Sequence, residues 1–120
     1  MKKDDFFGDE VYSYTSKQAE EDGLLFDITR LNKDWKKGGF NYVTFNLLSK
    51  GYVRDGKVSI PNILDLLNQC LFIVKKKSKD FTQHDSFFSG KIELPNGDRQ
   101  TIFMEQNETG KFTIMLPEDR

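Results

Sequence analysis

The longest regular pattern of hydrophobic positions in the chain is helical and covers residues 61–79. Apolar residues recur there at steps of three and four, which places them on one face of a helix. This face consists of Ile63, Leu66, Leu67, Cys70, Leu71 and Val74. Pro61 suits the first position of a helix, and the lysines that follow Val74 suit its negative end. The pattern therefore predicts a long central helix that buries one face.

Three stretches after this helix have the apolar content and alternation of β-strands. They cover residues 87–94, 100–105 and 111–116. The turn segments between them contain asparagine and glycine, which accept the positive φ of tight turns. One face of the resulting antiparallel meander is predicted to cover the central helix. Its apolar residues are Ile92, Leu94, Ile102, Met104, Phe112, Ile114 and Leu116.

The first half of the chain predicts shorter elements. Thr15 and Gln18 fit a capping box, so a short helix is expected over residues 16–22. A second helix is expected over residues 40–49, with Asn41 as its cap. Asp55-Gly56 is a strong signal for a two-residue hairpin turn.

These elements predict an α+β fold with a single domain over residues 1–120. In this fold, N-terminal helices and the long central helix pack on a C-terminal three-stranded antiparallel meander. The apolar run at residues 24–28 is too short to decide between a strand and a helical turn. An exposed edge strand, residues 87–94 or 111–116, would allow pairing with a second copy. A monomer and a homodimer therefore both stay open.

Composition narrows the class of protein. The chain has 18 Lys and Arg against 19 Asp and Glu, so it lacks the basic excess of a non-specific DNA binder. Its one cysteine, Cys70, lies on the apolar helix face, and we interpret it as a small buried hydrophobe. No intrachain disulfide can form, and no apolar run approaches the about 20 residues of a membrane span. We therefore expect a cytoplasmic protein without membrane contact.

Residues that could carry catalysis or hold a cofactor are few. His84 is the only histidine, whereas a metal site or a catalytic triad needs several clustered partners. A Gly-rich phosphate loop and paired metal-ligand spacing are both missing from the sequence, so no cofactor is expected. A small enzyme that works through carboxylates, such as Asp22 with Asp27, is the remaining catalytic alternative.

Charge is distributed unevenly along the chain. Acidic residues concentrate in the first quarter and basic residues in positions 30–79, an asymmetry that favours partners of opposite charge. The leading hypothesis is a non-enzymatic protein that binds a protein partner through an acidic face. That face consists of Glu20, Glu21, Asp22 and Asp27. The alternative is nucleic-acid binding through two basic clusters. These clusters are Arg54 with Lys57, and Lys75, Lys76 and Lys77 with Lys79.

The two ends of the chain carry short motifs. The beginning contains Tyr12-Ser13-Tyr14-Thr15, Gln18-Ala19, Asp22-Gly23-Leu24-Leu25 and Asp27, and the end reads Phe112-Thr113-Ile114-Met115-Leu116-Pro117-Glu118-Asp119. These motifs resemble an uncharacterised family of small bacterial, plasmid and phage proteins, in which isoleucine is usual where this chain has Phe112. The family has no established activity. The resemblance therefore implies a mobile-element or prophage setting and an accessory role, without supplying catalytic residues.

Overall fold

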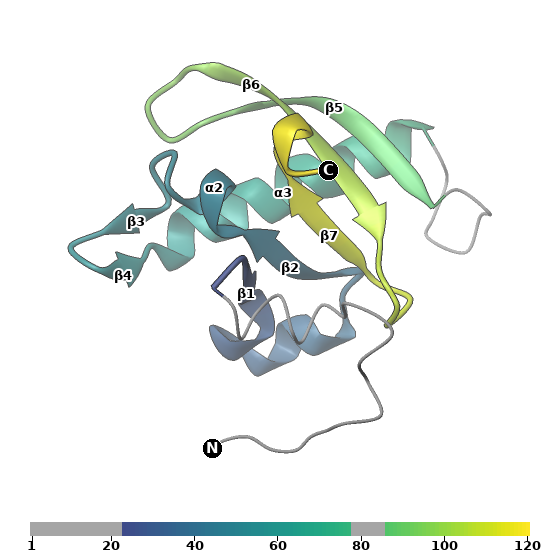
Figure 1. Cartoon of the computed structure of the whole chain (residues 1–120), viewed down its shortest axis with the longest axis horizontal. Coiled ribbons are helices and arrows are strands. Elements are labelled where there is room, and N and C mark those ends of the chain that lie inside the picture. The colour runs from purple at the N-terminus through teal and green to yellow at the C-terminus, as the bar shows by residue number, and fades with distance from the viewer. Residues whose placement is uncertain (1–22, 78–85) are drawn as a thin grey trace.

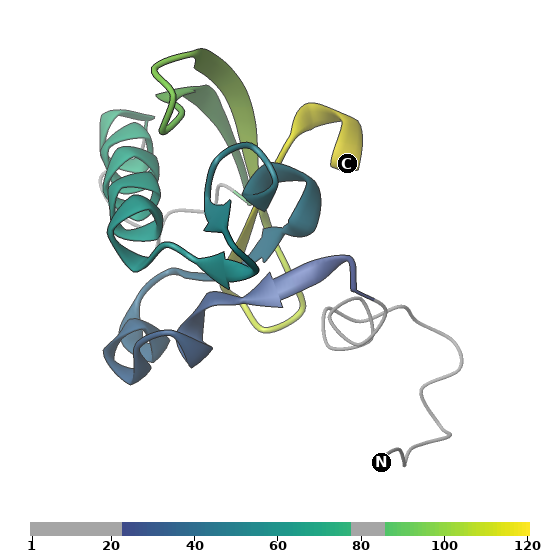
Figure 2. The ribbon, with the colours of Figure 1, turned by 90° about the vertical axis from the view of Figure 1, so that its left-hand side faces the viewer.

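The computed structural model describes residues 23–77 and 86–120, which form a five-stranded sheet with a long helix on one face (Figures 1 and 2). The order of the strands across the sheet is β1-β2-β7-β6-β5. The strands are β1 (Leu25–Asp27), β2 (Phe40–Thr44), β5 (Phe87–Glu93), β6 (Arg99–Gln106) and β7 (Phe112–Met115). The long helix is α3 (Ile60–Lys77).

Short elements connect these parts. The 3-10 helices η2 (Ile28–Arg30) and η3 (Lys33–Lys37) join β1 to β2. The single turn α2 (Phe45–Leu48) and the hairpin strands β3 (Val53–Arg54) and β4 (Lys57–Val58) lead from β2 to α3. The hairpin is the one predicted from Asp55-Gly56, and both residues have positive φ, 54° and 76°. The last element is η4 (Pro117–Asp119).

The predicted three-stranded sheet is wrong in its extent. Strands β5, β6 and β7 do form an antiparallel meander, but β2 lies alongside β7 in parallel, and β1 pairs with β2. The parallel pairing joins Val43 to Ile114, two positions far apart in the sequence. Strand β7 is therefore an interior strand, and the prediction that residues 111–116 form an exposed edge is also wrong. The edges of this sheet are β1 and β5.

The predicted N-terminal helices are wrong wherever the structure describes that part of the chain. Residues 40–49 were expected to be one helix, but they form strand β2 and the single turn α2. All five residues of β2 are buried between β1 and β7, and pairing on both sides outweighs the helical spacing of Phe45 and Leu48. Thr44 caps α2 by accepting from the Leu47 N–H at 3.3 Å. The helix expected at residues 16–22 lies outside the described residues.

Asn41, the expected cap, has a different role. Its side-chain amide donates to the Thr109 hydroxyl at 3.0 Å, and its carbonyl oxygen accepts from the Asn107 amide at 2.8 Å. Asn107 also donates to the Thr113 hydroxyl at 3.0 Å. This half-buried polar network ties the start of β2 to the turn before β7, so we assign it a structural role.

The core lies between α3 and the sheet. The helix buries Ile63, Leu66, Cys70, Ile73 and Val74, and all seven apolar residues predicted for the meander face are buried. Leu67 and Leu71, which were predicted for the buried face of the helix, are only partly buried. The buried face is therefore rotated away from them and toward Ile73. Gly90 of β5 lies under Ile73, where a Cβ atom would come within 2.7 Å of the Ile73 Cδ1 atom.

Cys70 is fully buried, and this burial raises the pKa of its thiol above the usual range. The thiolate is the reactive form of cysteine, so a thiol with a raised pKa is a poor nucleophile. The interpretation of Cys70 as a small buried hydrophobe agrees with this environment.

Tyr52 gives the first testable prediction. Its side chain is buried, and its hydroxyl finds no hydrogen-bond partner among the described residues. We expect Tyr52→Phe to raise the free energy of unfolding by about 1 kcal/mol, because a buried hydroxyl without a partner is unfavourable. Urea unfolding at neutral pH measures this difference. A loss of more than about 1 kcal/mol in the variant would show that the hydroxyl does make a stabilising bond.

The same variant has a pH signature. Burial raises the pKa of Tyr52 above its usual value of 10.0, and the nearby Cys70 and Asp65 act in the same direction. The folded state therefore holds the phenol proton more tightly than the unfolded chain does. The corresponding stabilisation is complete below pH 10 and is lost as the pH rises above it. Wild type should lose stability in this alkaline range faster than Tyr52→Phe.

Candidate functional site: an apolar groove beside the long helix

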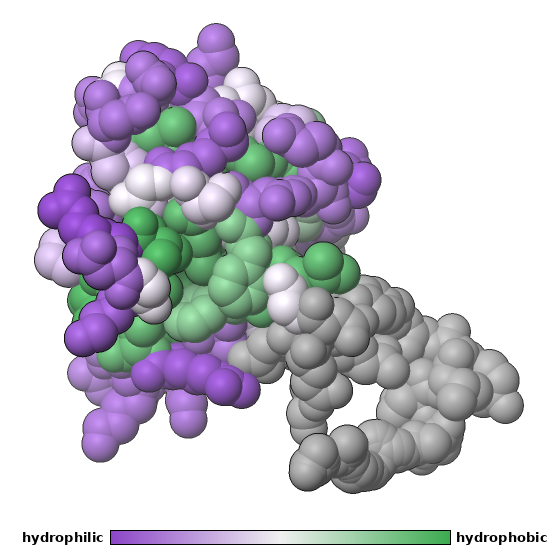
Figure 3. Space-filling model, turned by 60° about the vertical axis from the view of Figure 1, so that its left-hand side comes forward, coloured by the Kyte–Doolittle hydropathy of each residue, from purple (hydrophilic) through white to green (hydrophobic). Residues whose placement is uncertain are grey.

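The solvent side of α3 carries a second apolar stripe in addition to its buried face. Ile60, Leu64, Leu67 and Leu71 follow one another at steps of four, three and four residues, so they line up along the helix. Ile60 and Leu64 are each 46% exposed, and the neighbouring Phe72 is 62% exposed. The side of the molecule where β3, β4 and the start of α3 lie shows a broad apolar area bounded by hydrophilic side chains (Figure 3).

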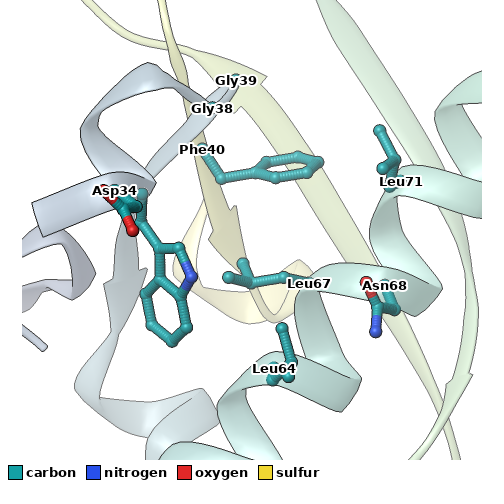
Figure 4. A pocket seen from close by; sticks show the side chains of 9 residues that line it. Asp34, Gly38, Gly39, Phe40, Leu64, Leu67, Asn68 and Leu71 are labelled. Carbon is teal, nitrogen blue, oxygen red and sulfur yellow. The ribbon is translucent and has the colours of Figure 1, made fainter. Parts of the chain in front are cut away.

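This stripe forms one wall of a groove whose other wall is η3 and the start of β2 (Figure 4). The groove has a volume of about 240 Å³. Its apolar lining comes from Trp35, Phe40, Leu64, Leu67 and Leu71. Two polar side chains, Asp34 and Asn68, also line it, and in the close-up the Phe40 ring extends across the space toward α3.

Local sequence fixes the second wall of the groove. The Asn32 side chain accepts from the Asp34 N–H at 2.9 Å and so begins η3. The helix ends where the Gly38 N–H donates to the Trp35 carbonyl at 3.0 Å. Gly38 and Gly39 then lead directly into Phe40, the first residue of β2. Trp35 is thereby held, half-buried, between two fixed ends.

Exposed lysines adjoin the groove-lining residues in the sequence. Lys33, Lys36 and Lys37 are exposed on η3, and the ammonium group of Lys111 donates to the Lys36 carbonyl. Lys75 stands four residues after Leu71, so it continues the apolar stripe with a positive charge. Of the carboxylates that the structure describes, Asp34 is the one in the groove lining. The two helices that flank the groove, η3 and α3, carry six lysines and two aspartates, so this rim is basic overall.

The residues of the predicted acidic face are not brought together by the described part of the chain. Glu20, Glu21 and Asp22 lie outside it. The carboxylate of Asp27 accepts from the Thr29 N–H at 2.9 Å and from the Thr29 hydroxyl at 2.5 Å, which caps η2. Asp27 therefore has a local structural role, and its pairing with Asp22 in catalysis stays a prediction.

The two predicted basic clusters lie at opposite ends of α3. Arg54 and Lys57 are on the hairpin before the helix, whereas the lysines at 75–77 are in its last turn. The 18 residues of α3 span roughly 27 Å at 1.5 Å per residue, so the clusters are separate surfaces. Lys77 donates to the Ser89 carbonyl at 2.5 Å, and Lys76 lies 5.3 Å from the centre of the Phe72 ring. Lys79 and His84 lie outside the described residues.

A second hollow, of about 270 Å³, lies between the start of β1 and η4. Its carboxylate, Asp119, is already occupied by three donors. It accepts from the Thr44 hydroxyl at 2.7 Å, the Asn46 amide at 2.6 Å and the Leu116 N–H at 3.1 Å. These bonds fasten η4 to the end of β2, so we interpret the hollow as part of the scaffold.

Comparisons with protein-family models, with curated proteins and with solved structures gave no match to this chain. Within residues 23–77 and 86–120, no three histidine, cysteine or carboxylate side chains are grouped as a metal ion would require. None of the helices in these ranges has the length and apolar character needed to cross a membrane. The groove and the charges around it are therefore the features from which we infer a function.

Proposed function

We propose that this chain is a non-enzymatic accessory protein that binds a protein partner, and that the groove between η3 and α3 is its docking surface. The observation that carries the proposal is the apolar stripe of α3, which adjoins the buried face of the helix and leaves Ile60 and Leu64 exposed and Leu67 and Leu71 only partly buried. Contiguous exposed apolar surface is typical of protein interaction sites. Leucine and aromatic side chains supply most of the lining, which suits a partner that brings apolar side chains of its own.

Two other features support the accessory role. The carboxylate of Asp27 is engaged by Thr29, which argues against the carboxylate enzyme. The resemblance of the two chain ends to small plasmid and phage proteins favours a mobile-element or prophage setting. Binding through the acidic residues Glu20, Glu21 and Asp22 stays a separate prediction.

Nucleic-acid binding is the second candidate, and one observation favours it. Phe72 is the most exposed of the large apolar side chains that the structure describes, and Lys76 lies against its ring. An exposed aromatic ring beside a cation is a platform on which a nucleotide base can stack. This reading predicts binding that depends on Phe72 and Lys76 and that weakens steeply as salt rises.

The docking surface can be tested by capture of partners from a bacterial lysate with two matched variants. Leu64→Glu places a charge in the groove, and Val53→Glu places one on the hairpin, at a position that is 40% exposed. Both positions are open to solvent, so neither variant should lose more than about 0.5 kcal/mol of stability. We expect Leu64→Glu to lose a captured protein that wild type and Val53→Glu retain, with and without nuclease.

Two results would contradict the docking surface. Equal capture by all three proteins would place the binding elsewhere on the chain. If capture is lost after nuclease treatment and in Phe72→Ala, nucleic-acid binding would replace protein docking as the proposed function. Thermal melting of each variant beforehand separates a loss of binding from a loss of fold.

A further inference from the structure

The chemistry of the groove indicates which kind of segment can occupy it. An extended peptide needs hydrogen-bond partners for its backbone, and three backbone groups along the η3 wall are already used. The Gly38 N–H donates to Trp35, the Gly39 carbonyl accepts from Phe112, and the Lys36 carbonyl accepts from Lys111. An extended backbone laid against leucine and tryptophan side chains would lose water without replacement. A helix satisfies its own backbone, so an apolar groove of this kind suits a helix.

The dimensions agree with a helical occupant. The apolar stripe from Ile60 to Leu71 is roughly 17 Å long at 1.5 Å per residue, and Lys75, which continues it, extends the surface to roughly 22 Å. A partner helix of about 15 residues covers the same length. Its apolar side chains would recur at steps of three and four to meet Leu64, Leu67 and Leu71.

The charges around the groove determine the polar side of the occupant. The η3 wall presents Lys33, Lys36 and Lys37, and Lys75 lies at the far end of the stripe. Asp34 in the groove and Asp65 beside Leu64 oppose them, but lysines outnumber aspartates on the two helices of the rim. Complementary potentials favour the correct partner and suppress partners of the same sign. An occupant whose polar side is acidic fits this rim, and one whose polar side is basic does not.

We propose that the groove binds an acidic amphipathic helix of a partner protein. This inference depends on the proposed function, because it names the occupant of the same docking surface. The apolar side of the partner helix contacts the α3 stripe and Trp35. Its acidic flank lies against the lysines of η3 and Lys75. A partner of the groove is acidic, whereas a partner bound through the acidic N-terminal residues would be basic. The two surfaces would therefore select different partners.

Trp35 is the only tryptophan of the chain, and it lines the groove, so its fluorescence reports occupancy directly. The probes are three synthetic peptides of about 15 residues. The first carries leucine at steps of three and four with glutamate on its polar side, the second has lysine in place of each glutamate, and the third is a scramble of the first. We expect the acidic peptide to shift the Trp35 emission and to bind at least about tenfold more tightly than the other two.

Charge variants test the rim. Lys36→Glu combined with Lys37→Glu should weaken binding of the acidic peptide by at least about tenfold and improve binding of the basic one. The control combines Lys50→Glu with Lys91→Glu, two exposed lysines that belong to neither η3 nor α3, and should leave both affinities unchanged. Higher salt should weaken the binding of the acidic peptide to wild type and to the control variant.

Each other outcome overturns the inference in a defined way. Equal affinity for the acidic and basic peptides excludes the acidic occupant, and equal affinity for the scramble excludes the helix. Tighter binding of an oligothymidine probe at the same tryptophan assigns the groove to single-stranded nucleic acid. If none of the peptides binds but Leu64→Glu still abolishes capture of the partner, the groove is the docking surface and only the proposed occupant is wrong. If both fail, the proposed function fails as well.

Discussion

Replacement of Phe112 with alanine is expected to lower the free energy of unfolding by about 3–5 kcal/mol. The side chain is 1% exposed, and its ring lies 5.6 Å from the ring of Phe88, measured between centroids. Phe112 belongs to β7, which joins the β1–β2 pair to the β5–β6 pair. The cavity left by alanine would therefore lie where the two parts of the sheet meet. A loss of this size is a large share of the stability of a small domain, which is about 5–15 kcal/mol.

Phe72→Ala is the matched control, because it removes the same side chain from a position that is 62% exposed. Its stability should change by no more than about 0.5 kcal/mol. Urea unfolding followed by Trp35 fluorescence measures both variants. Equal losses at the two positions would contradict an interior position for β7.

Gly90→Val is expected to lower the free energy of unfolding by about 2–3 kcal/mol, because the valine side chain has too little space between β5 and α3. A Cβ atom at Gly90 would lie 2.7 Å from the Ile73 Cδ1 atom and 3.1 Å from its Cγ1 atom. The end of the isoleucine side chain can move, but its branched atoms are also close. The added methyl groups of valine therefore press α3 away from β5.

Shortening the opposite side chain should relieve this pressure. Ile73→Ala alone should lower the free energy of unfolding by about 2–4 kcal/mol, because it leaves a cavity. When it is combined with Gly90→Val, the two losses of stability should not add. The double-mutant cycle is expected to give a favourable coupling of about 1–3 kcal/mol. Ile73→Ala combined with Val53→Glu, a change on the exposed hairpin and outside the core cluster, provides the additive reference. Strict additivity of Gly90→Val and Ile73→Ala would show that α3 does not rest on Gly90.

Much of the C-terminal half was predictable because its signals are local. The strands at 87–94, 100–105 and 111–116 alternate in polarity, and their turns carry residues that accept positive φ. Strand β2 was not predictable in the same way. Its residues Phe40–Thr44 do not alternate strictly between apolar and polar side chains, and the helical spacing of Phe45 and Leu48 suggested a helix. The parallel pairing with β7 that decides the matter involves residues far away in the sequence.

The groove was missed for a related reason. The apolar positions of α3 cover more of its circumference than one buried face requires, since Ile60 and Leu64 extend the arc. Sequence alone assigned Leu67 and Leu71 to the core, because the pattern does not reveal which side of a wide arc the sheet covers. Ile73, which faces Gly90, settles the rotation of the helix. The position of Trp35 across the groove from Leu64 depends on the fold and could not be predicted from the sequence.

The parallel alignment of β2 with β7 has a consequence for how the chain matures during synthesis. A ribosome delivers β1 and β2 long before the residues of β7, and until then the inner edge of β2 has no strand beside it. Long-range pairing of this kind forms slowly. The nascent chain thus exposes an apolar strand edge for most of its translation, which makes it a substrate for chaperones and proteases at that stage.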